Sequence, residues 1–278
     1  YKSGMLSAYV KDNTPNSLTK NKKIIVPVTI IESPPLKILS VRLYKNGKVI
    51  KDLLSENLDK ELKRKLKLPN KKEEKVEEAL KKVEFDDIAI ICYSLAKRTG
   101  IKKTPDICEI GLGGALENKI SFVIEHLGKE INFQDFFKKN ELIDIRGVTK
   151  GKGFEGPVKR FGIKLRQHKS EKGRRRPGSL GPWHPARVTF RVAMAGQTGF
   201  FTRVIYNSKI IEVGDVKSSK PSLTEKLKNI NNFGDIRTGF AIIYGSVPGP
   251  AKRQIIVTRP LRKTKKQEKK SYELVELR

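Results

Sequence analysis

The stretch GFAIIYGSVPGPAKRQIIVTRP, residues 239–260, contains two apolar, β-branched runs separated by glycine and proline. Short apolar runs bounded by such residues are typical of β-strands. Proline holds φ near −65° and has no N–H to donate, so the segment between the runs favours a corner over a continued strand. The stretch therefore predicts two strands that meet at a Pro/Gly corner.

The N-terminal part of the chain carries the same kind of signal. KIIVPVTII at 23–31 is an apolar, β-branched run, and Pro27 favours an edge strand or a bulge because proline cannot donate to a ladder. LSVRLYKNGKVI at 39–50 places Asn46-Gly47 between two strand-like runs, which is a strong signal of a β-hairpin. Both stretches therefore predict strands.

Two stretches in the second half of the chain extend this pattern. ARVTFRVAM at 186–194 alternates apolar with polar or basic side chains, as a half-buried strand does. FFTRVIYNSKIIEVG at 200–214 is similar to a hairpin that turns near Asn207-Ser208. Many short strands with turns between them favour a closed barrel. We therefore expect a mainly β fold.

The charge of the chain is distributed unevenly. The 278 residues carry a formal net charge of +29, whereas residues 47–141 hold 20 Lys+Arg and 18 Asp+Glu. The rest of the chain therefore carries a balance of +27. Self-repulsion of this size adds nothing to the stability of a compact domain, so it indicates a polyanionic partner. The charge pattern predicts a nearly neutral unit set within a strongly basic one.

The nearly neutral segment combines helix and strand patterns. KKEEKVEEALKK (71–82) predicts a helix with Glu–Lys pairs four residues apart, and LENKISFVIEHLG (116–128) predicts an amphipathic helix that ends at its glycine. DDIAIICYSLA (86–96) and TPDICEIGLGG (104–114) are typical of buried strands. We expect an α/β insertion here.

The cysteine count and the apolar runs exclude several classes of protein. Cys92 and Cys108 both lie in apolar runs, and two cysteines are too few for a disulfide framework or a Cys-rich zinc site. We predict that both are buried as small hydrophobic residues. No signal peptide is visible, and no apolar run approaches the ~20 residues that span a bilayer. These observations favour a cytoplasmic protein.

The segment between Arg146 and Arg191 is the most basic part of the chain. It holds fourteen Lys and Arg residues but only two acids, and its core at 147–185 carries eight glycines and four prolines. It has no long apolar periodicity, so it cannot bury a face of its own. Long loops without secondary structure are uncommon and usually functional. Since Lys and Arg neutralise phosphates, the composition predicts an RNA-binding loop.

The predicted RNA-binding residues are the cations and histidines of this loop, its tryptophan, and three later or flanking cations: Lys150, Lys152, Lys159, Arg160, Lys164, Arg166, His168, Lys169, Lys172, Arg174, Arg175, Arg176, Trp183, His184, Arg187, Lys252 and Arg253. We further expect three glycines to let the backbone run close to a crowded polyanion, namely Gly151, Gly153 and Gly156.

GKGFEG at 151–156 matches the G-x-G-x-x-G spacing of a dinucleotide-binding turn, which raises the alternative of an NAD enzyme. Such a turn must run into a helix whose N-terminus holds the pyrophosphate. Here VKRFGIKLRQHKSEKGRRRPG follows, with glycines and scattered charge in place of an apolar stripe. We therefore expect a basic arm with no helix behind the glycines, and no cofactor.

The only tryptophan and two of the three histidines allow alternatives. Trp183, in LGPWHPARV, either packs the loop base against the barrel or presents a rigid aromatic surface to RNA. His168 and His184 are metal ligands only in principle, because no further His, Cys or acidic cluster accompanies them. No Ser-His-Asp order or H-E-x-x-H motif occurs, so no catalytic residues, no metal and no enzymatic activity are expected.

Five longer motifs resemble a known family. They are GVTKGKGFEGPVKRFG, LGPWHPARVTFRVAMAGQTGF, YNSKI, IYGSVPGPAKR and, at the start, YKSGM, and PVTIIESPPLKILSVRLY and TPDICEIGLGG extend the match in the right order. The match extends over most of the chain, which is similar to ribosomal protein L3 in its archaeal and eukaryotic form.

The resemblance implies a fold and a function. It implies a translation-factor-like, closed six-stranded β-barrel, an inserted two-layer α/β domain, and a long basic loop that extends toward the peptidyl-transferase centre. It also implies a non-catalytic, cytoplasmic constituent of the large ribosomal subunit that binds its rRNA, nucleates early assembly and supports accommodation of tRNA and elongation factors. The neighbours it implies are ribosomal proteins L14 and L24e, without a homo-oligomer. It favours an RNA contact for Trp183 over packing.

The expected domain limits follow from the resemblance together with the charge pattern. They are a first part of the barrel at 1–46, the α/β insertion at 47–141, the rest of the barrel at 142–262 with the loop at 150–185, and a charged tail at 263–278 that we expect to be poorly ordered until bound.

The sequence departs from the family pattern at a few places. The basic extension that precedes YKSGM in the family is not in this sequence. Glu171 stands where eukaryotic members carry a modified histidine, and Phe161 stands where many members have tryptophan. A free RNA-binding or RNA-modifying protein of another class stays an alternative, which a catalytic cluster or a cofactor pocket would favour.

Overall fold

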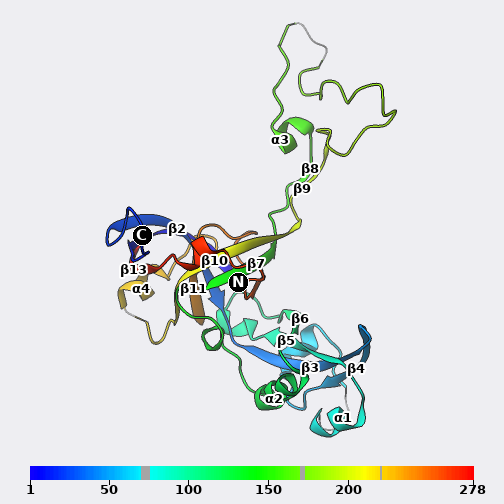
Figure 1. The fold of residues 1–278 in the computed structure, drawn as a ribbon, viewed down its shortest axis with the longest axis vertical. Helices are drawn as coiled ribbons and strands as arrows, with labels where there is room; N and C mark the ends of the chain where they lie inside the picture. Colours follow the sequence, from blue (N-terminus) through cyan, green and yellow to red (C-terminus); the bar gives the residue numbers. More distant parts are fainter. Residues whose placement is uncertain (70–75, 170–172, 220) are drawn as a thin grey trace.

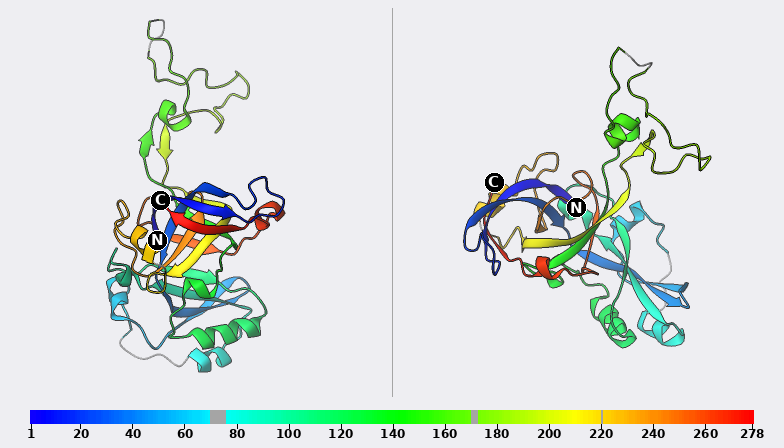
Figure 2. Two further views of the ribbon diagram at one scale, coloured as in Figure 1. Left: turned by 90° about the vertical axis from the view of Figure 1, so that its left-hand side faces the viewer. Right: turned by 45° about the horizontal axis from the view of Figure 1, so that its top comes forward.

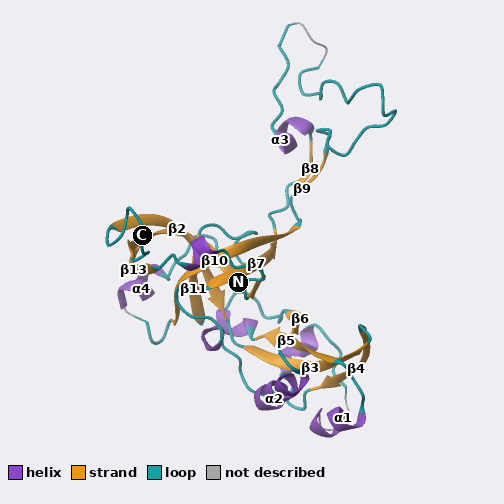
Figure 3. Ribbon diagram, viewed as in Figure 1, coloured by secondary structure: helices purple, strands orange, loops and turns teal. Residues whose placement is uncertain are grey.

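A computed structural model of the chain describes residues 1–69, 76–169, 173–219 and 221–278. They form a curled seven-stranded sheet, a four-stranded sheet with helices on it, and a long arm (Figures 1 and 3). The order in the larger sheet is β12-β7-β10-β11-β2-β1-β13. Its strands are β1 (Lys2–Asp12), β2 (Lys23–Ser33), β7 (Leu142–Val148), β10 (Thr202–Asp215), β11 (Gly239–Tyr244), β12 (Ile255–Thr258) and β13 (Tyr272–Leu277).

The larger sheet is antiparallel at every described pairing and curls around its own apolar side chains (Figure 2). Val28, Ile30 and Phe240 are almost fully buried in the largest apolar cluster. The mainly β expectation is confirmed, and β11 and β12 are the two strands predicted around the Pro/Gly corner. The closed six-stranded barrel is not observed: the sheet has seven strands, and no pairing among the described residues joins β12 to β13.

The extra strand comes from the C-terminal tail, so the expectation of a poorly ordered tail is wrong. After the short helix α5 (Lys265–Glu268), β13 pairs with β1, and Tyr272 and Leu277 are buried in the core. The tail ends in YELVEL, in which apolar side chains recur between glutamates. The preceding run of lysines obscured this strand signal.

Two further strand predictions need correction. Residues 200–214 do not form a hairpin: β10 is one long strand with an irregularity between Ile205 and Ser208, where Asn207 has φ +54°. The β2 strand lies inside the sheet, not at its edge. Pro27 is tolerated there because pairing with β11 ends at Val28, one residue away, so the missing N–H removes no ladder bond on that side.

The second sheet has the order β4-β3-β5-β6 and is packed against two helices (Figure 1). Its elements are β3 (Leu36–Lys45), β4 (Lys48–Leu54), β5 (Asp87–Ser94), β6 (Ile107–Gly111), α1 (Val76–Lys82) and α2 (Leu116–His126), with 3-10 turns at Lys60–Arg64, Ala96–Thr99 and Phe133–Asp135. We call these elements the α/β domain.

The predicted elements of the α/β domain are present. Asn46 and Gly47 join β3 to β4 with φ values of +50° and +71°, as a tight hairpin turn requires. The helix predicted at 71–82 is seen from Val76 onward, and residues 71–75 lie outside the described residues. The sheet also takes in β3, which precedes residue 47, whereas the domain limits themselves stay a prediction.

The two cysteines face each other across the β5–β6 pair. Cys92 is fully buried and Cys108 is half-buried, and both are free thiols. Burial raises the pKa of Cys92 to about 12. At neutral pH Cys92 is therefore a protonated thiol that packs as a small hydrophobic residue, as expected.

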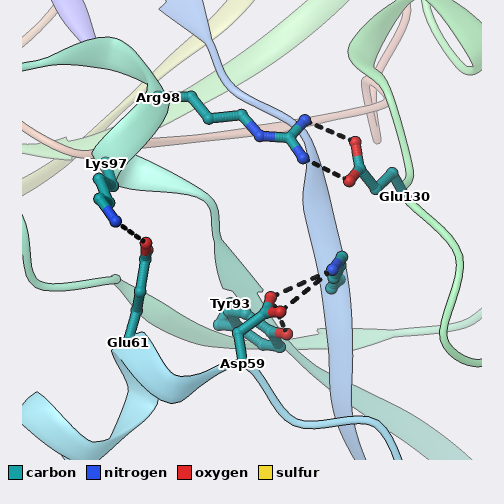
Figure 4. Close-up of polar contacts among 7 residues, drawn as sticks. Asp59, Glu61, Tyr93, Lys97, Arg98 and Glu130 are labelled. Atoms are coloured by element: carbon teal, nitrogen blue, oxygen red, sulfur yellow. Dashed lines mark hydrogen bonds and ion pairs between the residues drawn. The ribbon is translucent and has the colours of Figure 1, made fainter.

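The charged groups of the α/β domain pair with one another. A hollow of about 550 Å³ beside β5 is lined mainly by charged side chains. In Figure 4, the Asp59 carboxylate accepts hydrogen bonds from Tyr93 and from Lys37, and Lys97 forms an ion pair with Glu61. Arg98 binds Glu130 with both terminal nitrogens, at 2.7 and 2.6 Å. Ion pairs within the chain thus neutralise most of the charged side chains that line the hollow.

Candidate nucleic-acid interface

The arm, residues 149–201, leaves the larger sheet where β7 ends and β10 begins (Figures 1 and 2). Its base continues the β7–β10 ladder: the Thr149 amide donates to the Phe201 carbonyl at 2.9 Å, and the Lys152 amide donates to the Thr198 carbonyl at 2.9 Å. The short strands β8 (Gly153–Glu155) and β9 (Gly196–Thr198) then pair. These hydrogen bonds make the base of the arm a two-stranded stalk, which fixes the direction in which the arm extends.

A short helix, α3 (Pro157–Phe161), follows the stalk, so the expectation of no helix behind the GKGFEG glycines is wrong. Pro157 occupies the first turn, where its missing N–H costs nothing, and Gly162 ends the helix in the left-handed conformation. The geometry nevertheless differs from that of a dinucleotide fold. The preceding strand β8 pairs antiparallel with β9, and the helix has five residues.

Arg160 fastens α3 to the stalk. Its Nη1 donates to the Met194 carbonyl at 2.9 Å and its Nε donates to the Gln197 carbonyl at 3.2 Å. Gly196 makes room for this, because a Cβ there would lie 3.0 Å from the Arg160 guanidinium. Arg160 was predicted to contact RNA, but in this structure its guanidinium holds the stalk together.

The remaining part, residues 163–193, is the distal arm, and its described residues form neither helix nor strand (Figure 3). The strand predicted at 186–194 is therefore wrong, and the irregular segment extends past residue 185. Phe190 is 94% exposed, since no neighbouring strand or apolar layer covers it. An alternating pattern becomes a strand only when a partner supplies hydrogen bonds and a core.

Most predicted RNA-binding residues of the arm project into solvent. The exposed ones are Lys150, Lys152, Lys159, Lys164, His168, Lys169, Arg174, Arg175, Arg176, Trp183, His184 and Arg187. Lys172 lies outside the described residues. Arg166 is half-buried and donates to the Pro177 carbonyl at 3.1 Å.

Lys159 is already neutralised inside the protein. It lies 2.8 Å from Glu155, which is 7% exposed. The hydrogen bond from Lys159 holds the pKa of the Glu155 carboxyl below its usual range, so this acid stays charged at neutral pH. Among the predicted cations, Lys159 and Arg160 are therefore less available to phosphate than their exposed neighbours.

The three glycines of the GKGFEG motif differ in their structural need. Gly153 has φ +72°, which a larger residue adopts at a cost. A Cβ on Gly151 would lie 3.5 Å from the Phe200 side chain, and Gly156 has an ordinary φ with open space where a Cβ would stand. Close approach to RNA stays a prediction for all three.

Lys252 and Arg253 lie on the corner between β11 and β12, and the Arg253 guanidinium lies 5.6 Å from the centre of the Phe200 ring at the root of the arm. Lys2 holds this corner: its Nζ donates to the carbonyls of Val247 at 2.5 Å and Gly249 at 3.0 Å. Burial, and after it the charge of Lys150, lowers the pKa of Lys2. The corner thus adds two predicted cations, the exposed Lys252 and the half-buried Arg253, beside those of the stalk.

Exposed aromatic rings accompany the cations. Trp183 is 88% exposed, so it does not pack the loop base against the sheet in this structure. Phe190 and Phe200, at 94% and 62% exposed, were not predicted as site residues. A signal for Phe200 existed, since two adjacent phenylalanines at 200–201 cannot both face the core of one strand.

The part of the chain that the structure describes holds no group of three or more His, Cys, Asp or Glu side chains that could bind a metal. Among the same residues, no helix is both long and apolar enough to cross a membrane.

Comparisons with known proteins agree with this geometry. A family model described as Ribosomal protein L3 matches residues 1–278. The chain is 38% identical to the large ribosomal subunit protein uL3 of Methanocaldococcus jannaschii over 273 residues, which cover 94% of this chain and 80% of that protein. It is 41% identical to uL3 of Picrophilus torridus (95% and 81% covered) and 39% identical to uL3 of Archaeoglobus fulgidus (95% and 82%).

These relatives bear the name of a large-subunit ribosomal protein, which confirms the expectation of a protein that is not an enzyme. The match covers the curled sheet, the α/β domain and the arm alike, and this chain belongs to the ribosomal protein L3 family.

Proposed function

We propose that this chain binds large-subunit rRNA through the arm and the corner next to it. The observation that carries the proposal is the exposure of most described cations of the arm, from Lys150 to Arg187. Leaving Arg166 aside, Lys159 is the one among these described cations that forms an ion pair. An RNA backbone supplies the missing negative charge, and each phosphate contact releases counterions.

The proposed contact surface comprises the exposed cations and histidines of the arm, Trp183, and the two cations of the corner. Arg174, Arg175 and Arg176 form its densest cluster. They belong to the distal arm, which extends away from the sheet (Figure 1). A guanidinium can bind a phosphate with two parallel hydrogen bonds or stack on a base, so this cluster suits the crowded interior of a folded RNA.

The arm further supports a role at a distance from the body of the protein. Its stalk is held by backbone hydrogen bonds and by Arg160, whereas the distal arm has no core of its own. Such a segment reaches into RNA that a compact domain cannot approach. We propose that it extends toward the peptidyl-transferase centre, and that it supports accommodation of tRNA and elongation factors there.

The body supplies the other part of the proposed function. The larger sheet belongs to the strongly basic part of the chain, and a folded surface of this kind can bind rRNA before neighbouring ribosomal proteins join. We propose that it nucleates early assembly of the large subunit in this way. The proposed protein neighbours are L14 and L24e. They would contact the body and not the arm, because the arm presents cations and single aromatic rings in place of a continuous apolar surface.

Removal of the arm tests the proposal. A variant in which a Gly-Gly link joins Lys150 to Phe200 should keep the ladder, because these two residues already share a backbone hydrogen bond of 3.3 Å. We expect it to unfold with the same midpoint as the full chain. Its affinity for large-subunit rRNA should fall, and the slope of log K against log [salt] should become shallower.

The same variant separates binding from function. Large subunits reconstituted with it should assemble poorly or show reduced peptidyl-transferase activity. Unchanged salt dependence of rRNA binding would contradict the proposed interface, and fully active subunits would contradict the proposed role of the arm. A variant with Gly-Gly in place of Asn46-Gly47 in the β3–β4 turn of the α/β domain serves as the matched control.

A further inference from the structure

Two residues at the root of the arm have an unusual backbone conformation. Nine described residues other than glycine have positive φ, and seven of these are asparagines, which tolerate this conformation. The two exceptions are Phe200 at φ +59° and Lys252 at φ +67°. A bulky or long side chain at positive φ costs free energy, and such residues tend to cluster at functional sites.

The two exceptions belong to one place in the fold. The guanidinium of Arg253, the residue after Lys252, lies 5.6 Å from the centre of the Phe200 ring. Two close backbone approaches accompany this arrangement. A Cβ on Gly199 would lie 1.9 Å from the Lys150 carbonyl oxygen, and one on Gly249 would lie 2.9 Å from the Val148 carbonyl oxygen and 2.8 Å from the Arg253 side chain.

The strained backbone presents the Phe200 ring to solvent. Phe201 is half-buried, whereas the left-handed conformation at Gly199 and Phe200 turns the preceding ring outward and leaves Phe200 62% exposed. The ring therefore gains little from burial. A free-energy cost without matching burial indicates that something outside the chain uses the ring.

The surroundings of the ring identify the ligand by its chemistry. Arg253 faces the ring, and the exposed Lys252 precedes it on the corner. Lys150 and Lys152 lie on the opposite side of the stalk. An aromatic ring bordered by cations offers a stacking surface to a nucleobase and charge to its phosphate. Paired bases are stacked inside a duplex, so the fitting ligand is an unpaired nucleotide.

We propose that Phe200, Lys252 and Arg253 form a single-nucleotide site at the root of the arm. The Phe200 ring stacks on one unpaired rRNA base, and the two cations of the corner bind its phosphate. This site rests on the proposed rRNA binding and adds to it a residue, Phe200, and a class of target. It also ties the direction of the stalk to the RNA, because the ring lies on the short segment between β9 and β10.

Phe200→Asn tests the site, because asparagine tolerates positive φ and lacks the ring. The full-length variant is titrated onto large-subunit rRNA transcribed in vitro, and base reactivity is probed at each unpaired nucleotide. We expect affinity to fall about five- to a hundredfold, the range for loss of one stacked base. The salt slope should stay unchanged, and a base protected by the wild type should become reactive.

Two further variants separate stacking from packing. Phe200→Trp should keep both affinity and protection, whereas Arg253→Gln should lower the salt slope by about one. Thermal unfolding of Phe200→Asn should occur at the same temperature as in the wild type or higher, because the strain is relieved. A purely structural ring would instead give a lower unfolding temperature with unchanged affinity and protection.

The outcomes separate this site from the broader function. If the wild type binds rRNA with a steep salt slope and Phe200→Asn matches its affinity and its protected bases, the single-nucleotide site is wrong and rRNA binding stands. If the wild type fails to bind rRNA, the proposed function is wrong and the site falls with it.

Discussion

The α/β domain and the arm both carry many cations, but they neutralise them in different ways. In the α/β domain Arg42 binds Asp52 and Glu109, each at 2.8 Å, and Arg98 binds Glu130. In the arm, leaving Arg166 aside, the described residues form one ion pair, between Lys159 and Glu155. The first region satisfies many of its charges within the chain, whereas most described cations of the second are exposed.

Burial follows the same division. The α/β domain holds a core in which Leu43, Ile88 and Val123 are almost fully buried. The distal arm holds no buried side chain among its described residues. A region with paired charges and a core is stable by itself, whereas a region with neither is ordered by what it binds. The comparison predicts that mutations in the two regions affect different measurements.

The largest effect is expected from Leu43→Ala. This side chain is fully buried in β3, so its truncation should lower the free energy of unfolding by about 2–5 kcal/mol. The matched control is Phe190→Ala in the distal arm, which should change that free energy by less than about 0.5 kcal/mol. Urea unfolding measures both. Equal losses would mean that the arm shares the core's stability.

Replacement of Arg174, Arg175 and Arg176 by Gln should have the largest effect on RNA binding. If each guanidinium contacts one phosphate, the salt slope of rRNA binding should fall by about two to three. The control is Arg98→Gln, whose charge is bound by Glu130, and it should leave the slope unchanged. A similar change in both variants would show that total charge decides binding, and not its location.

Asp12, at the end of β1, provides a pH test of a charge that hydrogen bonds within the chain stabilise. Burial by itself would raise the pKa of Asp12, but hydrogen bonds from Thr14, Thr19 and Ser17 outweigh it and hold the value at about 2. The folded pKa lies below the unfolded one, so this stabilisation is present above about pH 4 and is lost as the pH falls toward 2. It amounts to about 2 kcal/mol.

Unfolding of the wild type and of Asp12→Asn between pH 6 and pH 2 measures this contribution. The difference in unfolding free energy between them should shrink as the pH falls through this window. The Asp12 carboxylate accepts these hydrogen bonds within the connection between β1 and β2, so this connection should open first. A constant difference between the two proteins would contradict the role of the charged form.

The smallest effect is expected from Arg160→Gln, which probes how α3 is fastened to the stalk. Loss of the two hydrogen bonds to the stalk should change the global free energy of unfolding by less than about 1 kcal/mol, because the arm opens locally. Hydrogen exchange at the Lys152 amide should become faster. Arg175→Gln is the control, and equal exchange in both variants would show that Arg160 does not hold the stalk.

The sequence predicted the elements that carry their own signals. Asn46-Gly47 predicted the β3–β4 hairpin because few residues adopt two consecutive positive φ values, and the glycine after residues 116–127 predicted the end of α2. The basic surplus outside 47–141 predicted a polyanionic partner, because charge depends on composition and not on contacts.

Other predictions failed where neighbours decide the outcome. Residues 186–194 alternate like a strand but have no partner strand in the arm, and residues 200–214 pass straight through Asn207 because both β7 and β11 pair with β10. Arg160 looked like any other cation of the arm, yet Gly196 lies far away in sequence and gives it a place in the stalk. None of these contacts is visible in local sequence.

By itself, the sequence determined the division of charge, the strand-rich composition and the family, because each depends on which residues are present and in what order. Only the tertiary structure decided that the tail completes the sheet as β13, that Lys159 and Arg160 are engaged inside the arm, and that the Phe200 ring is turned outward beside Arg253. These outcomes depend on segments far apart in the chain, and their free energies come from contacts that exist only after folding.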